Sequence, residues 1–126
     1  MNSPTPYGFH IDRNPSDIME QYGILGEDYA HKKARSQYLD DMEKTVLAGI
    51  KNELAHSMRG GDKDPPETKI TRLALADVRY TEFLEELHAA REQAMLAEIA
   101  FKKEDKRIEL LRSLETSART QMERFS

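Results

Sequence analysis

The chain contains no cysteine and no tryptophan, and aromatic residues make up only 7% of its 126 positions. Without cysteine it can form neither disulfides nor thiolate metal sites, which is typical of proteins from a reducing cytoplasm. No apolar run approaches the roughly eighteen residues that a membrane-spanning helix needs. Residues 1–10 also lack the basic and apolar regions of a signal peptide. We therefore expect a cytoplasmic protein with no membrane attachment.

Large side chains are scarce and charged ones are plentiful. Charged residues account for 33% of the chain, and the formal net charge is −4. A core built from this chain alone would be thin, so we expect a homo-oligomer. β-Branched residues are few and almost no stretch alternates with period two, which argues against a sheet. The composition favours an all-α fold. With this net charge, any site for a polyanion has to be local.

The clearest pattern is an apolar repeat between Leu73 and Phe125. Steps of three and four residues pass through sixteen positions, of which fourteen are apolar or alanine. This spacing is typical of a helix that packs along its length against other helices. Glu104 and Glu115 interrupt the repeat, and we expect them to face basic side chains of a partner helix or to mark where the contact frays. The larger members form a predicted oligomer seam of Tyr80, Phe83, Leu87, Phe101, Ile108, Leu111 and Met122.

Residues 1–26 hold three prolines and three glycines, so we expect an N-terminal arm that is flexible or partly helical. Residues 27–126 should form a helical hairpin domain. Gly60 and Gly61 supply the stop after its first helix, and Asp77 caps its last. The whole is predicted to be an elongated antiparallel helical hairpin with a long, coiled-coil-like C-terminal helix. Its helices should span about 27–58, 66–76 and 78–124.

Residue types that support catalysis or metal binding occur without the necessary spacing. Glu85 and His88 form one Glu-x-x-His step, whereas a di-iron bundle needs a second step and two further carboxylates. The four histidines show no metal-ligand spacing between them. The glycines before Lys63 lack the strand and the Lys-Ser or Lys-Thr pair of a phosphate loop. We therefore expect no enzyme activity, no cofactor and no metal site.

Basic residues gather near the C-terminus, where residues 99–126 carry seven Lys or Arg against five Asp or Glu. Lys106, Arg112 and Arg119 repeat at intervals of six and seven, which suggests one stripe along a phosphate backbone. The alternative is a solvated helix face laced with intrahelical ion pairs. The candidate nucleic-acid-binding residues are Lys102, Lys103, Lys106, Arg107, Arg112 and Arg119.

Several short patterns are spread along the helices. They are Tyr29-Ala30-x-x-x-Ala34-x-x-x-Tyr38-Leu39, Asp77-x-x-Tyr80-x-x-x-Leu84-x-x-Leu87-x-x-Ala90, Arg107-x-Glu109-x-x-Arg112-Ser113 and Ser117-x-Arg119-x-x-Met122. In this layout the chain resembles small helical proteins from bacteriophage recombination and replication regions. Over about residues 28–122 it is similar in plan to UvsY-type recombination mediators. The resemblance implies a helical oligomer that binds single-stranded DNA and helps to load a recombinase. It also implies that Arg107, Arg112 and Arg119 face DNA or a neighbouring copy.

Two functional hypotheses follow. The first is a phage-type accessory protein for DNA recombination or replication, located in the host cytoplasm, which binds single-stranded DNA weakly as a helical oligomer and scaffolds a recombinase or another protein. The second is a protein-interaction module, such as an inhibitor of a host defence nuclease or a virion assembly factor. The two hypotheses differ in whether the C-terminal arginines are free or paired with neighbouring carboxylates. If Glu109, Glu115 and Glu123 neutralise Arg112 and Arg119, the DNA hypothesis fails.

Overall fold

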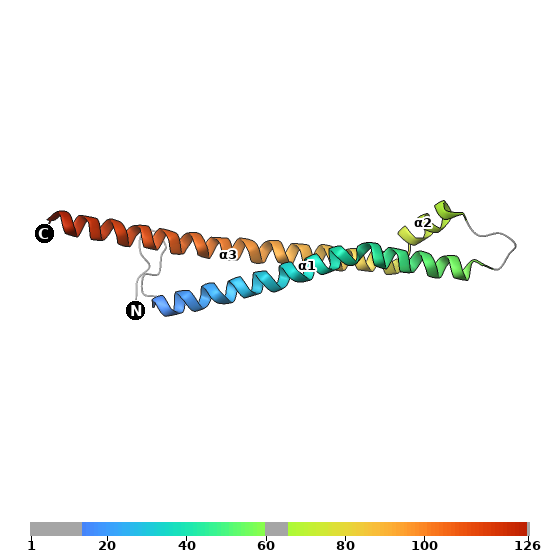
Figure 1. The fold of residues 1–126 in the computed structure, drawn as a ribbon, viewed down its shortest axis with the longest axis horizontal. Helices are drawn as coiled ribbons and strands as arrows, with labels where there is room; N and C mark the ends of the chain where they lie inside the picture. Colours follow the sequence, from blue (N-terminus) through green and yellow to red (C-terminus); the bar gives the residue numbers. More distant parts are fainter. Residues whose placement is uncertain (1–13, 60–65, 126) are drawn as a thin grey trace. The chain divides into compact units, whose positions relative to one another are not determined.

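The computed structural model describes residues 14–59 and 66–125, and within those ranges it contains three α-helices and no strand. Helix α1 spans Pro15–Ser57, α2 spans Glu67–Leu75 and α3 spans Val78–Phe125 (Figure 1). The predictions of an all-α fold and of a long C-terminal helix are confirmed. The predicted stop at Gly60 and Gly61 and residues 1–13 of the predicted arm lie outside the described residues.

Helix α1 begins at Pro15 and not near residue 27 as predicted. Asn14 caps this end, because the backbone N–H of Ser16 donates a hydrogen bond to Asn14 Oδ1 over 2.8 Å. Proline suits the first helical position, where its missing N–H would have no partner inside the helix. Residues 15–26 of the predicted flexible or partly helical arm are therefore helical, and the first long helix starts earlier than predicted.

Two of those glycines lie inside α1 in different surroundings. A Cβ built on Gly23 would have no neighbouring atom within 4 Å. A Cβ built on Gly26 would lie 3.1 Å from Cε2 of Phe101 in α3. Gly26 therefore allows the Phe101 ring to approach the α1 backbone closely, which offsets the conformational cost of glycine in a helix.

The described residues divide into two compact units, and both boundaries fall inside α1 and α3. The terminal unit combines α1 up to Ala30 with α3 from Leu96. The central unit is His31–Met95, which includes α2. Each unit is therefore built from one piece of α1 and one piece of α3.

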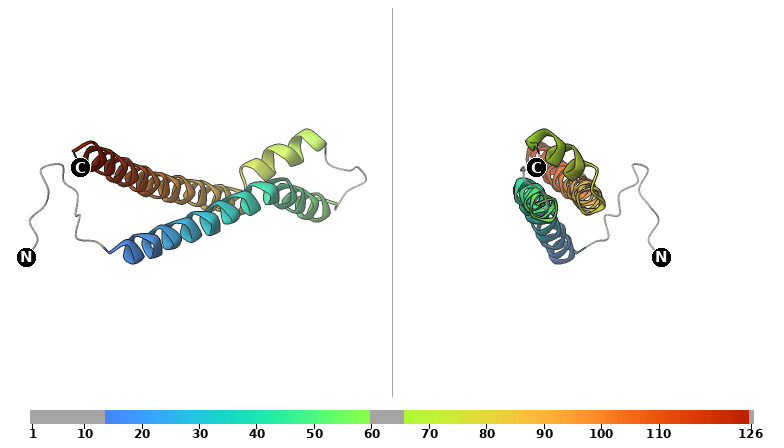
Figure 2. Two further views of the ribbon diagram at one scale, coloured as in Figure 1. Left: turned by 60° about the vertical axis from the view of Figure 1, so that its left-hand side comes forward. Right: turned by 90° about the vertical axis from the view of Figure 1, so that its right-hand side faces the viewer.

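In the central unit α1 and α3 are antiparallel. Leu39 of α1 packs with Leu87 of α3, and Ile50, later in α1, packs with Tyr80, earlier in α3. Ala74 of α2 joins the second of these clusters, so α2 lies beside the C-terminal part of α1 (Figure 2). Leu87 is only 1% exposed and is the largest fully buried side chain.

In the terminal unit the contact between the two helices is aromatic. The Tyr22 ring of α1 stacks on Phe101 of α3 with 4.9 Å between centroids, and Tyr29 lies 5.9 Å from the same ring.

The carboxylate of Glu104, which interrupts the apolar repeat of α3, is buried in the terminal unit. Glu104 is 9% exposed, and its Oε2 lies 3.9 Å from Nη1 of Arg107. In the described residues, no buried side-chain N or O atom lacks a hydrogen-bond partner.

The predicted oligomer seam is used largely within the chain. Its members from Tyr80 to Leu111 are buried or half-buried, and α1 of the same chain supplies contacts to Tyr80, Leu87 and Phe101. Met122, the last member, is 75% exposed. The periodicity identified the contact face of α3, but periodicity alone does not distinguish a contact within one chain from a contact between chains.

Asp77 caps α3, as predicted. The backbone N–H of Arg79 donates to Asp77 Oδ1 over 2.9 Å, and the Arg79 side chain donates to the same carboxylate over 3.1 Å. These bonds from Arg79 hold the pKa of Asp77 below its usual value. Arg79 also pairs with Glu53 of α1, so the cap is connected to the neighbouring helix.

The two glycines of α1 provide a matched test of the packing in the terminal unit. Gly23→Ala should raise stability by about 0.5–1 kcal/mol, because alanine favours the helix and its methyl group meets nothing. Gly26→Ala should melt at a lower temperature than Gly23→Ala, because its methyl group would press on Phe101. Thermal unfolding followed by circular dichroism measures both. Equal gains from the two substitutions would contradict the close contact with Phe101.

The Asp77 carboxylate should make stability depend on pH. Because its pKa is lower in the folded state, its stabilising contribution is present above the unfolded value near pH 4 and is lost as the pH falls further. Asn also caps helices but does not titrate, so Asp77→Asn should flatten the decline in melting temperature below about pH 4. An unchanged decline in Asp77→Asn would show that Asp77 does not contribute.

Candidate nucleic-acid interface

All six predicted nucleic-acid-binding residues lie on α3 within the terminal unit. Five have exposed side chains, and Arg107 is half-buried beside Glu104. The helix is continuous through this region, so the positions of these side chains around its axis follow from regular α-helical geometry. The structure therefore keeps the six residues on one element but does not place them on one face.

The predicted single stripe is wrong for Lys106. At 3.6 residues per turn, the six-residue step from Lys106 to Arg112 places them about 120° apart around the helix axis. The seven-residue step from Arg112 to Arg119 returns to nearly the same face. We call Arg112 and Arg119 the arginine pair. Arg112 lies near the contact with α1, because it lines a cavity together with Met19 of that helix.

The three lysines lie on the outer side of α3. Lys103 and Lys106 are one turn apart, and Ile99 and Leu110 continue their line in both directions at intervals of four residues. Ile99 and Leu110 are 56% and 42% exposed, so this side of α3 is not covered by α1. We call the set Ile99, Lys103, Lys106 and Leu110 the lysine face.

Ion pairs divide the six cations into two classes. Lys102 Nζ lies 2.6 Å from Glu98 Oε1, a hydrogen bond that raises the pKa of Lys102, and Arg107 pairs with Glu104. Within the described part of the chain, the other four have no carboxylate oxygen within 4.0 Å. These four are Lys103, Lys106, Arg112 and Arg119. Contact with Glu109 or Glu115 therefore does not neutralise the arginine pair.

Arg112 lines a small cavity between α1 and α3 in the terminal unit. The cavity has a volume of about 140 Å³, and Met19, Tyr22, Asp105 and Glu109 are among its other lining residues. The Tyr22 hydroxyl donates to Asp105 Oδ1 over 3.1 Å, which raises the pKa of Tyr22. This volume is below the 300 Å³ or so at which small-molecule pockets begin. The cavity therefore positions Arg112 beside an acidic group without forming a ligand pocket.

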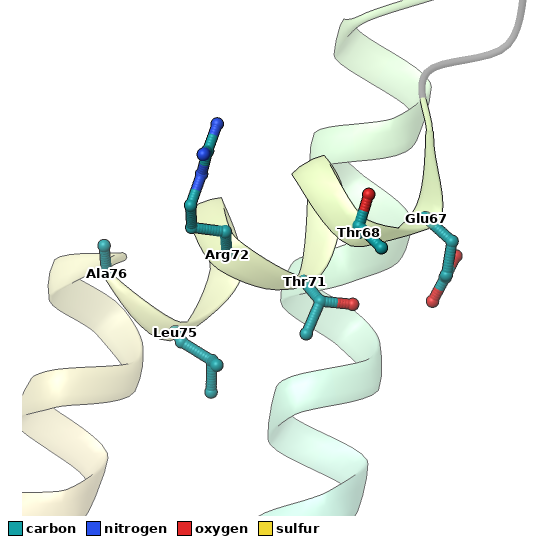
Figure 3. A pocket seen from close by; sticks show the side chains of 6 residues that line it. All are labelled: Glu67, Thr68, Thr71, Arg72, Leu75 and Ala76. Atoms are coloured by element: carbon teal, nitrogen blue, oxygen red, sulfur yellow. The ribbon is translucent and has the colours of Figure 1, made fainter.

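A larger hollow, which was not predicted from the sequence, lies along α2 in the central unit. It encloses about 530 Å³, is wide open to solvent and has an almost entirely apolar lining. Figure 3 shows the six lining side chains, which all come from α2 and the residue after it: Glu67, Thr68, Thr71, Arg72, Leu75 and Ala76. Leu75 could have indicated this hollow, because it is a large apolar residue of α2 that does not belong to the buried positions Ile70 and Ala74.

Across residues 14–59 and 66–125, no group of three or more His, Asp or Glu side chains is arranged to bind a metal ion. Glu85 and His88 are both exposed on α3. None of the described helices is long and apolar enough to cross a membrane. The candidate interface therefore consists of exposed charged and apolar side chains on helical surfaces.

Comparison of the chain with protein-family models, with curated proteins and with solved structures found no match.

Proposed function

We propose that the chain is a non-catalytic accessory protein for DNA recombination or replication, of the phage type that it resembles. It binds single-stranded DNA weakly in the host cytoplasm and scaffolds a protein partner such as a recombinase. No reaction is assigned to it. Several copies act together, so that weak individual contacts add up along one strand.

The supporting observation is the set of four exposed cations without an ion pair. A lysine or arginine that is already held by a carboxylate has to give up that partner to bind a phosphate. Lys103, Lys106, Arg112 and Arg119 have no such partner within the described residues, so each can bind a phosphate without first breaking an ion pair.

The arrangement of these cations favours a single strand. Around the axis of α3, Lys106 lies about 120° from Arg112 and Lys103 lies about 180° from it. A stiff duplex would follow one of these lines of charge, whereas a flexible single strand can bend around the helix and reach both. Glu104, Asp105 and Glu109 lie between the cations and reduce the local field, which is consistent with weak, salt-sensitive binding.

A second candidate, a protein-interaction module, is favoured by the uncovered end of α3. Leu114 and Met122, both large apolar residues of α3, are 53% and 75% exposed. Such a surface suits a partner helix. An inhibitor of a host defence nuclease or a virion assembly factor would fit this second candidate.

The DNA proposal predicts an effect that is specific to the arginine pair. Fluorescence anisotropy with a labelled single-stranded oligonucleotide should show binding at low salt that weakens as salt rises. The double variant Arg112→Glu, Arg119→Glu should bind more weakly, and its slope of log affinity against log salt should fall by about 1.4, or about 0.7 for each lost phosphate contact.

Arg72→Glu serves as the control for charge. Arg72 is an exposed arginine of α2 in the central unit, and replacing it changes the net charge in the same direction as each substitution in the arginine pair. It should leave the salt slope unchanged. The proposal fails if the wild-type chain does not bind at low salt, or if Arg72→Glu weakens binding as much per substitution as the arginine pair does.

A further inference from the structure

The outer side of α1 in the terminal unit is acidic. Tyr22 and Tyr29 turn toward Phe101 of α3, and Ile24, two residues after Tyr22, lies almost opposite to it around α1. Ile24 is 54% exposed, and Asp17, Glu20 and Glu27 are exposed beside it at intervals of three and four residues. We call Asp17, Glu20, Ile24 and Glu27 the acidic face. Its three carboxylates have no ion pair within the described residues.

The lysine face of α3 lies on the other outer side of the same unit. Ile99 precedes Phe101 by two residues, so it lies nearly opposite to the ring that contacts α1. The acidic face and the lysine face therefore point away from each other, each on the side of its helix that the other helix does not cover. Both combine exposed apolar side chains with charges of one sign.

The two faces match in spacing as well as in charge. Along α1, Asp17, Glu20 and Ile24 are separated by three and then four residues. Along α3, Lys106, Lys103 and Ile99 show the same steps when read backward, and Lys103, Lys106 and Leu110 show them when read forward. In either direction of approach, two carboxylates meet two ammonium groups while Ile24 meets an exposed apolar side chain.

We propose that the acidic face of α1 docks on the lysine face of α3 in a second copy of this chain. The inference goes beyond the proposed function, because it requires no DNA. It places self-association on the outer faces of the terminal unit, whereas the sequence predicted it at the seam that α1 already occupies. In the assembly the neighbouring copy engages Lys103 and Lys106, so docking and a nucleic-acid strand compete for these two lysines, while the arginine pair stays available for phosphate.

The opposite directions of the two faces determine the kind of assembly. Because the two faces of one copy point in opposite directions, they cannot both enter the same interface with a second copy. The contact is therefore not the reciprocal contact of a two-fold dimer. Each copy offers one acidic face and one lysine face, and a contact of this kind continues into a ring or an open array. Exposed ion pairs are individually weak and are screened by salt, so assembly should grow with protein concentration and shrink as salt rises.

Charge exchange tests the docking on the full chain without DNA. By sedimentation and light scattering at low salt, the wild-type mass should rise beyond that of a dimer with concentration. Asp17→Lys with Glu20→Lys should abolish this rise, and so should Lys103→Glu with Lys106→Glu. An equimolar mixture of the two variants should recover it, because each face then meets an opposite charge on the other variant. Glu82→Lys with Glu85→Lys, exposed on α3 of the central unit, is the matched control and should assemble like the wild type.

Cross-linking tests which residues meet, and the chain has no cysteine of its own to interfere. Ile24→Cys should form a disulfide between copies when mixed with Ile99→Cys if the helices approach antiparallel, or when mixed with Leu110→Cys if they approach parallel. A disulfide in neither mixture would overturn the docking. So would a wild-type chain that stays monomeric or stops at a dimer, or a mixture of charge variants that fails to recover assembly.

Anisotropy on the same variants separates this inference from the proposed function. Asp17→Lys with Glu20→Lys removes no cation from α3, so this variant should lose self-association while it keeps the arginine pair for DNA. Loss of assembly together with retained oligonucleotide binding at low salt supports the docking and the DNA contact independently. Assembly that responds to charge exchange in a chain that never binds DNA would support the docking alone.

Discussion

Apolar side chains of α1 and α3 meet in both units, and the other features of the chain depend on that contact. In the central unit Leu39 and Ile50 of α1 pack with Leu87 and Tyr80 of α3. In the terminal unit Phe101 takes the same role between Tyr22 and Tyr29. A helix as long as α3 gains most of its stability in water from such packing and not from helix propensity. Because this contact uses one side of each helix, it also decides which side chains remain available for partners.

The division of charge follows from this packing. Cations and carboxylates near the contact pair within the chain, as Arg35 does with Glu86 and Arg107 does with Glu104. On the outer sides of the terminal unit, the exposed carboxylates lie on α1 and the exposed lysines lie on α3. A chain with a net charge of −4 can therefore present a local basic surface. The function we propose relies on this separation and needs no enclosed pocket.

Much of the fold could be read from the sequence because its signals are local. The repeat in α3, the cap at Asp77 and the short helix near residues 66–76 depend on neighbours within a turn or two, and the structure contains all three. Asn14 and Pro15 are a local start signal for α1, but the continuity of this helix through Gly23 and Gly26 could not be predicted. Gly26 is read as a helix breaker until Phe101, which is remote in sequence, is known to pack against it.

The candidate site was predicted less completely than the fold. The sequence identified the basic residues but not their faces, because a count of six or seven residues was taken as one stripe where helical geometry separates Lys106 from Arg112. It also could not show which cations are paired, since that depends on side-chain positions such as those of Lys102 and Glu98. The open hollow along α2 had no sequence signal that was recognised.

The contact between α1 and α3 closes within one chain. It is tested most directly by cross-linking Arg35→Cys with Glu86→Cys, whose native side chains approach to 2.6 Å in the central unit. A short bismaleimide is added to a dilute equimolar mixture of ¹⁵N-labelled and unlabelled chains, and the linked peptides are identified by mass spectrometry. The account predicts linked peptides that are wholly labelled or wholly unlabelled. Linked peptides that combine one labelled and one unlabelled partner in the proportion of free exchange would show that the seam joins separate copies, which would contradict it.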